Sequence, residues 1–317
     1  MNTIKGKNLH PENCSKKKTK KKDPLSWWLK RIDDLRRHSD ALYRLDPTVY
    51  EVGPQAVSKL SILAYYIDIY TTIMKKHFPE RRICYVDLFA GCGLCRIKDR
   101  GDVILGSATL ASYIPSQTQR NFDHIVLFEK NPNFVNALKK RIPNAKIYQS
   151  DVNEIELGKI LNKVCGENPI LAFVDPEGLD LNWSTLEQLL IKWSDVIINY
   201  QPEAVRRVHG NRDKPGYSDR LDQFFGTNDW RNIGYDDERY LNLYIKKIKK
   251  FKEIVEYIKV SGKGSYFYYI LLATKKTRGN NPWLEAVKNL KQRIEKTKGD
   301  VIEQLIAIYR KEQITLC

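Results

Sequence analysis

Residues 85–93 read YVDLFAGCG, an apolar segment that ends in two glycines one position apart. Its β-branched and aromatic residues favour a strand, and the small residues after it favour a tight turn. Glycine allows a positive φ and lets a ligand approach the backbone without a Cβ in the way. In an open α/β sheet a ligand lies beyond the carboxyl ends of the strands, so we expect Gly91 and Gly93 to line a ligand site. Arg96 stands where the fingerprint G-x-G-x-x-G needs its third glycine, which disfavours a nicotinamide cofactor.

Apolar runs alternate with helical patterns on both sides of this segment. The expected strands are 83–89, 124–129, 145–148, 170–174 and 196–200, and the expected helices are 108–114, 132–141, 154–164 and 184–192. Such alternation is typical of βαβ units. We therefore expect an α/β protein with a Rossmann-like, mostly parallel sheet and helices on both of its faces.

The chain divides into five expected parts around this sheet. Residues 1–23, with eight lysines and two acids, form a disordered basic tail. Residues 24–80 form an N-terminal helical extension (helices at 25–45 and 55–77), and residues 81–202 form the core. Residues 203–260 form a helical insertion, or cap, with a last helix at 240–260. Residues 261–317 complete the core with a strand at 265–273 and a helix that begins at Pro282.

An acidic residue accompanies each of the first four expected strands. Asp87 lies within the first, Glu129 ends the second, Asp151 follows the third and Asp175 follows the fourth. An acid that ends the second strand is placed to accept both hydroxyls of a ribose, and an acid after the third can accept a hydrogen bond from an adenine amine. We attribute the long stretch before Glu129 to a polar loop at 96–105. This order of acids predicts an adenosine-type ligand.

These segments resemble the class I S-adenosylmethionine-dependent methyltransferase fold and, more narrowly, the three-Cys-motif partner (TcmP) family. The matching segments are the helix KLSIL at 59–63 with Tyr66, DLFAGCG at 87–93, GS at 106–107, FVDPEGL at 173–179 with Trp183, DVIIN at 195–199 with Arg206, and LLAT at 271–274. Cys92 and Glu177 depart from the family, which commonly has proline and an aromatic residue there. The resemblance spans about residues 55–295.

The resemblance implies S-adenosylmethionine as the cofactor. The candidate cofactor-binding residues are Asp87, Phe89, Gly91, Gly93, Ser107, Glu129, Asp151 and Val152. The family name also implies a partner protein with a three-cysteine, iron–sulfur-type motif.

The candidate catalytic residues are Asp175, Glu177 and Asn199, which follow the fourth strand or end the fifth. Methyl transfer needs in-line positioning, exclusion of water and in some cases a base. Asp175-Pro176-Glu177-Gly178 lacks the second proline and the aromatic residue that would hold a base amine, so adenine amino-methylation is not supported. Cytosine C5 methylation is not expected either, because no cysteine nucleophile follows until Cys317. The alternative role of Glu177 is turn formation.

The chain of 317 residues has 54 Lys and Arg against 38 Asp and Glu, a net charge of +16. This excess favours a polyanionic partner, and we expect RNA or DNA, with Arg206, Arg207, Lys246 and Lys247 as contacts. The alternative interpretation is a solvated basic surface with a solubilising tail.

Six sparse cysteines indicate a reduced, cytoplasmic protein, and no apolar run is long enough for a membrane span. The N-terminus has no apolar segment of the kind found in a secretory signal. We interpret Cys92 and Cys95 as small residues at a crowded turn rather than as a redox pair, and we expect no metal site.

The sequence therefore predicts a methyltransferase-like protein of the TcmP type that acts on or with nucleic acid. The alternative hypothesis is a non-catalytic partner of an iron–sulfur or radical enzyme that retains the fold.

Overall fold

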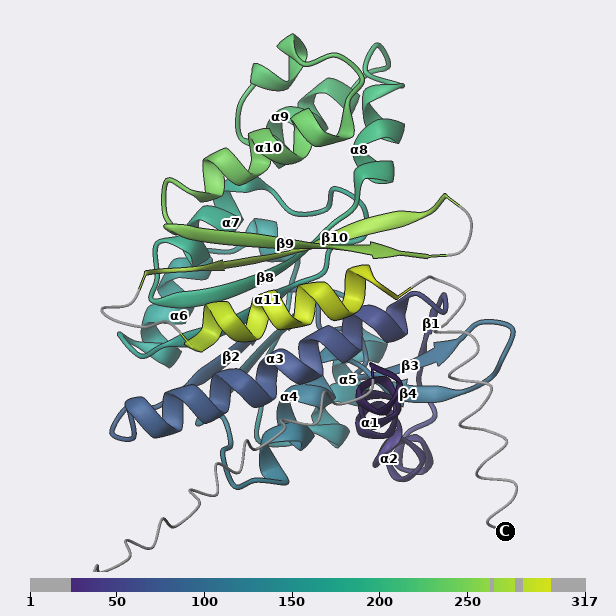
Figure 1. Ribbon diagram of the computed structural model, residues 1–317, viewed down its shortest axis with the longest axis vertical. Coiled ribbons are helices and arrows are strands. Elements are labelled where there is room, and N and C mark those ends of the chain that lie inside the picture. The colour runs from purple at the N-terminus through teal and green to yellow at the C-terminus, as the bar shows by residue number, and fades with distance from the viewer. Residues whose placement is uncertain (1–23, 263–264, 277–281, 298–317) are drawn as a thin grey trace, which may run out of the picture.

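The computed structural model describes residues 24–262, 265–276 and 282–297, shown as coloured ribbon in Figure 1. The expected tail at 1–23 and the last part of the C-terminal segment, 298–317, lie outside the described residues. None of the described helices combines the length and the apolar character that crossing a bilayer requires.

A seven-stranded sheet forms the centre of the molecule, in the order β6-β5-β2-β7-β8-β10-β9. Its strands are β2 (Cys84–Asp87), β5 (His124–Glu129), β6 (Lys146–Gln149), β7 (Ile170–Val174), β8 (Ser194–Tyr200), β9 (Ile254–Ser261) and β10 (Phe267–Thr274). The first five are parallel, whereas β10 runs antiparallel to both of its neighbours. The expected fold class is thereby confirmed: an α/β protein with a Rossmann-like sheet that is mostly parallel.

Helices cover both faces of the sheet, because the side chains of each strand alternate between two cores. Tyr85 belongs to one core and Val86 to the other. The helices against the first core are α1 (Pro24–Arg36), α2 (Ser39–Leu45), α3 (Ala56–His77), α4 (Ser107–Ser116), α5 (Pro132–Arg141) and α11 (Pro282–Glu295). Those against the second are α6 (Leu157–Cys165), α7 (Trp183–Leu190), α8 (Pro202–His209), α9 (Tyr217–Phe225) and α10 (Asp237–Ile248).

The N-terminal extension and the segment after the glycine turn each differ from the expectation. The single helix expected at 25–45 is two helices, α1 and α2, separated at His38, whose φ is 72°. Residues 96–105, expected as a polar loop, instead contribute to a hairpin of β3 (Leu94–Ile97) and β4 (Val103–Leu105). A third strand, β1 (Tyr50–Val52), pairs in parallel with β3. The hairpin forms because its apolar residues pack into the first core while Asp99 and Gly101 turn the chain with positive φ.

The helical insertion is shorter than expected. It consists of α8, α9 and α10, which lie together beyond the sheet at the top of Figure 1. The helix expected at 240–260 ends at Ile248, and residues 254–261 form the edge strand β9 of the main sheet. The physical reason is the β-branched alternation of IVEYIKVS, which places Ile258 and Val260 in the core and leaves Tyr257, Lys259 and Ser261 exposed.

Candidate functional site

A cavity of about 650 Å³ opens at the carboxyl ends of the parallel strands. The turn after β2, the ends of β5 and β8 and the loops after β6 and β7 contribute to its wall, as the sequence analysis expected of a ligand site. Ten predicted residues line it: Phe89, Gly91, Gly93, Ser107, Glu129, Asp151, Val152, Asp175, Glu177 and Asn199. The structure thus brings these residues together, and their roles stay predictions.

The glycine turn has the backbone that only glycine adopts without strain. Gly91 has φ +60°, and a Cβ built on it would meet nothing within 4 Å, so that side of the turn is open. Gly93 has φ +84°, and a Cβ there would lie 2.9 Å from Cγ2 of Thr109. The carbonyl of Gly93 accepts hydrogen bonds from the Gly106 N–H (2.8 Å) and from Thr109 Oγ1 (2.5 Å). The turn is therefore anchored on one side and open on the other.

Two carboxylates of the cavity organise the backbone around it. Glu129 accepts hydrogen bonds from the N–H of Gly91 (2.9 Å) and of Asn131 (2.8 Å), one on each oxygen. Asp151 accepts the N–H of Asn153 (2.9 Å) and so begins a 3-10 helix, Val152–Glu154. Each carboxylate oxygen has a second lone pair, which remains for a ligand hydroxyl or amine.

Asp87 differs from the expectation of direct cofactor contact. Its exposed fraction is 0% and it does not line the cavity. Its carboxylate accepts hydrogen bonds from the N–H of Phe89 and from the Tyr85 hydroxyl, both at 3.1 Å. Burial raises the pKa of Asp87 to about 7, against the lowering effect of hydrogen bonds from Ser107, Phe89 and Tyr85. Asp87 therefore stabilises the glycine turn from its buried side, through the hydrogen bond from the Phe89 N–H.

At the other end of the cavity, Asp175 lies between two partners. Its Oδ1 accepts a hydrogen bond from Asn199 Nδ2 (2.7 Å), and its Oδ2 forms an ion pair with Lys59 of α3. The side chains of Lys59 and Asp175 are only 18% and 20% exposed. Sequence reasoning missed Lys59 as a site residue. Its place in the KLSIL segment of the family resemblance was the one available signal. The sequence does not show that Lys59 pairs with Asp175, because the two residues are 116 positions apart.

Glu177 is not merely a turn residue, because it accepts a hydrogen bond from the hydroxyl of Tyr50. The Tyr50 ring also makes an edge contact with Phe134 of α5, with centroids 5.9 Å apart. Burial and the neighbouring Glu177 carboxylate raise the pKa of Tyr50 well above its ordinary value. All three residues line the cavity, and there Tyr50 contacts both the loop after β7 and helix α5. Sequence reasoning missed Tyr50, because no local pattern links the extension to the loop after β7.

The predicted nucleic-acid contacts do not line the cavity. Arg206 pairs with Asp237 (2.8 Å). Lys247 donates to the carbonyls of Phe225 (2.5 Å) and Gly226 (2.8 Å) at the end of α9, and its Nζ lies 4.1 Å from the centroid of the Trp183 ring. Burial lowers the pKa of Lys247. Arg206 and Lys247 therefore hold the insertion together, whereas Arg207 and Lys246 are exposed.

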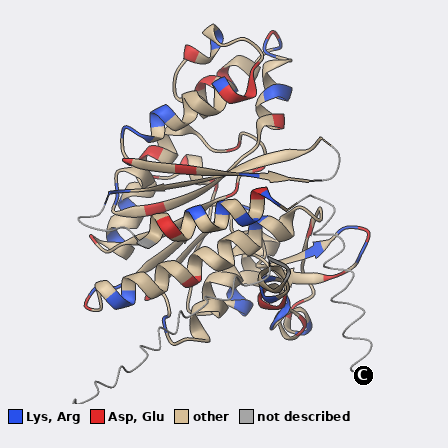
Figure 2. Cartoon of the chain, in the orientation of Figure 1, with Lys and Arg blue, Asp and Glu red and all other residues tan. Residues whose placement is uncertain are grey.

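The insertion is also less basic than the whole chain. Residues 203–253 contain 12 Lys and Arg against 9 Asp and Glu, and both colours alternate over the insertion in Figure 2. Within it, Arg231 pairs with Asp222 and Arg239 with Asp236, and Arg220 pairs with Asp180 in the loop after β7. Arg207 reaches the edge of the site, since its Nη2 is 3.5 Å from where a Cβ on the cavity-lining Gly178 would be.

Cys92 and Cys95 both line the cavity, and burial disfavours the reactive thiolate form of each. Burial raises the pKa of both, that of Cys95 to about 12. Cys92 Sγ donates to the carbonyl of Leu94 at 3.1 Å. In the part of the chain that the structure describes, no three His, Cys, Asp or Glu side chains gather in a way that suits a metal ion.

No protein-family model and no curated protein matches this chain. Similar solved structures include protein LPL1258 from Legionella pneumophila str. Philadelphia 1, of the family model DUF519, at 13% identity and a TM-score of 0.45, over 74% of this chain and 93% of that one. The plantazolicin methyltransferase BpumL in complex with SAH has 11% identity and a TM-score of 0.36, over 80% and 95%. M. jannaschii TYW2 in complex with AdoMet has 12% identity and a TM-score of 0.31, over 65% and 74%. At such values the likeness carries no conclusion about the chemistry of the cavity.

Proposed function

We propose that this protein binds S-adenosylmethionine in the cavity and transfers its methyl group to a substrate that enters beside Asp175. The observation that carries the proposal is the convergence of the open glycine turn, Glu129 and Asp151 on one cavity at the ends of β2, β5 and β6. When bound, the cofactor supplies an electrophilic methyl group on a sulfonium.

The charge of the cavity suits this cofactor. Of the described residues that line it, six are carboxylates (Glu51, Glu129, Asp151, Asp175, Glu177 and Asp180) and two are lysines (Lys59 and Lys130). A sulfonium and an ammonium group gain from this excess of negative charge, whereas a phosphate inside the cavity would be repelled. The open side of Gly91 also leaves space for close approach to the backbone.

In this proposal each residue has a distinct task. Glu129 accepts hydrogen bonds from the ribose hydroxyls, and Asp151 with Val152 holds the adenine. Asp175, held by Asn199 and Lys59, orients the substrate nucleophile and accepts its proton. Tyr50 and Glu177 close the same end against water.

We further propose nucleic acid as the substrate or partner, of the kind that the resemblance to the TcmP family and the charge of +16 suggest. Because the cavity is acidic, the phosphates remain outside it, near Arg207 and Lys246, and only a neutral group enters. A three-Cys-motif protein is the proposed second partner.

The test is isothermal titration calorimetry with S-adenosylmethionine, followed by transfer of labelled methyl to mixed RNA and DNA. The matched variant is Asp151→Asn, which removes the charge but keeps the hydrogen-bond acceptor that begins the 3-10 helix. We expect the wild type to bind and Asp151→Asn to bind about tenfold more weakly. Absence of binding to the wild type would refute the proposal. Binding without transfer, alone and with a three-Cys-motif protein, would favour the alternative of a non-catalytic partner.

A further inference from the structure

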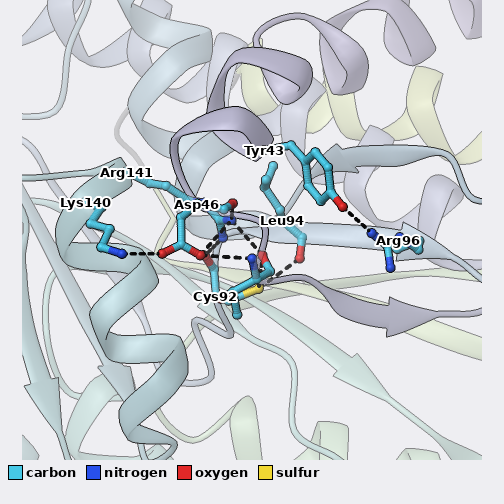
Figure 3. Close-up of polar contacts among 8 residues, drawn as sticks. Tyr43, Asp46, Cys92, Leu94, Arg96, Lys140 and Arg141 are labelled. Carbon is cyan, nitrogen blue, oxygen red and sulfur yellow. Dashed lines mark hydrogen bonds and ion pairs between the residues drawn. The ribbon is translucent and has the colours of Figure 1, made fainter.

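Arg141, the last residue of α5, contacts two parts of the chain that are distant in sequence. Its Nη1 donates to the carbonyl of Cys92 in the glycine turn at 2.5 Å. Its Nη2 donates to the carbonyls of Asp46 (2.5 Å) and Thr48 (2.6 Å), in the segment between α2 and β1. Figure 3 shows Arg141 between Asp46 and Cys92.

The guanidinium is fully enclosed. The exposed fraction of the Arg141 side chain is 0%, and its Nε is buried without a hydrogen-bond partner among the described residues. Asp46 Oδ1 lies 3.8 Å from Nη2 and compensates the charge, while Asp46 Oδ2 pairs with the exposed Lys140 at 2.7 Å. The hydrogen bond from Lys140 keeps the pKa of Asp46 well below its usual range, so this carboxylate stays ionised. A buried charge with such partners holds its neighbours in one geometry, because moving either segment leaves unpaired polar groups behind.

The two segments also touch each other beside Arg141. Cys92 Sγ lies 3.6 Å from the carbonyl of Thr48, which is a second acceptor within reach of the thiol beside Leu94. Two residues after Thr48, β1 begins and pairs with β3, which begins one residue after Gly93. Tyr50, Glu51 and Val52 of β1 all line the cavity. The extension therefore contributes to the wall of the cavity, and Arg141 lies at its junction with the glycine turn.

We propose that Arg141 is a positioning residue that couples the docking of residues 46–52 to the conformation of the glycine turn, so that the N-terminal extension is an obligatory part of the ligand site. For its effect on the cofactor this inference rests on the proposed function, but the coupling itself does not. The stem of Arg141 packs beneath the turn, with Cδ 3.8 Å from where a Cβ on Gly93 would be. The role of Cys92 in this coupling is to present its carbonyl to Arg141 and its thiol to Thr48, which requires a small side chain and no redox chemistry.

The test compares Arg141→Lys with the wild type by hydrogen–deuterium exchange and by calorimetry with S-adenosylhomocysteine. Lysine keeps the charge but cannot reach three carbonyls with a planar fork. The matched control is Lys139→Met, which removes an exposed charge from the same helix. Arg141→Met is the stronger variant where it folds.

We expect Arg141→Lys to accelerate exchange in both residues 46–52 and residues 91–95, and to weaken S-adenosylhomocysteine binding about tenfold, within the usual range of couplings between sites. Lys139→Met should match the wild type in both measurements. Faster exchange in residues 46–52 alone, with 91–95 unchanged, would overturn the coupling. So would a folded variant with faster exchange in both segments and a Kd within about twofold of the wild type. If the wild type itself binds no S-adenosylhomocysteine, the proposed function fails, while the exchange data still decide the coupling.

Discussion

Replacing Gly91 by alanine separates the backbone requirement of the turn from its role in binding. Gly91 has φ +60° and open space where a Cβ would lie, and it lines the cavity. Gly101, in the β3–β4 hairpin, has φ +71° and equally open surroundings, but it does not line the cavity. Gly101→Ala therefore pays the same conformational penalty as Gly91→Ala and serves as its control.

The magnitudes follow from the shared backbone geometry. An L-residue in the left-handed region costs about 1–2 kcal/mol, and the stiffer unfolded chain of an alanine variant offsets about 0.4–1 kcal/mol of this. Each variant should thus lose about 1 kcal/mol of unfolding free energy, which lowers Tm by about 2–4 °C in a domain of this size. Only in Gly91→Ala does the new methyl group enter the space of the ligand. There we expect a Kd at least tenfold higher, equivalent to about 1.4 kcal/mol.

Thermal unfolding and calorimetry with S-adenosylhomocysteine measure the two effects on the same samples. We expect equal Tm values for the two variants and unequal affinities. A Gly91→Ala variant that binds within twofold of the wild type would refute a role of Gly91 in binding, and so would a Gly101→Ala variant that loses as much affinity as Gly91→Ala.

Three further predictions concern other parts of the molecule. Lys59→Met leaves Asp175 with Asn199 alone, so methyl transfer should slow about tenfold or more while the Kd of S-adenosylhomocysteine stays within twofold; an unchanged rate would exclude Lys59 from the reaction. Because the pKa of Asp87 is raised from 3.8 to about 7, the folded state binds the proton more tightly than the unfolded state. The protonated Asp87 therefore contributes its full stabilisation of the folded state below pH 4. This contribution, at most about 4 kcal/mol, is lost as pH rises to 7. Urea unfolding between pH 4 and 8 should therefore show a smaller decline for Asp87→Asn, and identical slopes would contradict the assignment. Finally, Arg207→Ala and Lys246→Ala should each weaken RNA binding and lower by about 1 the slope of log K against log salt concentration. Arg206→Ala should mainly lower Tm. If that slope is unaltered in both Arg207→Ala and Lys246→Ala, the nucleic-acid surface lies elsewhere.

Local patterns were sufficient for six of the seven strands of the main sheet and for ten residues of the cavity. The strands β2 and β7 are buried throughout and apolar except for Asp87, so their positions are visible in the sequence. The rule that ligands lie at the carboxyl ends of parallel strands brings Glu129, Asp151 and Asp175 together. Patterns failed where a short segment depends on packing. The β3–β4 hairpin contains polar residues at its turn and owes its strands to the core beneath them. Strand β9 was expected as part of a helix because lysines and apolar residues there suit either period.

The sequence by itself determined the order of the acids, the two glycines and therefore the class of fold, since these depend on neighbours within one strand and its turn. Only the tertiary structure decided which side chains meet. It buried Asp87 behind the turn, paired Lys59 with Asp175, brought Tyr50 to Glu177 and placed Arg141 between the extension and Cys92. It also engaged Arg206 and Lys247 within the insertion and left Arg207 and Lys246 exposed. The physical reason is that a charge or hydrogen bond acts over a few ångströms in space, and the packing of helices on the sheet sets which residues come within that range.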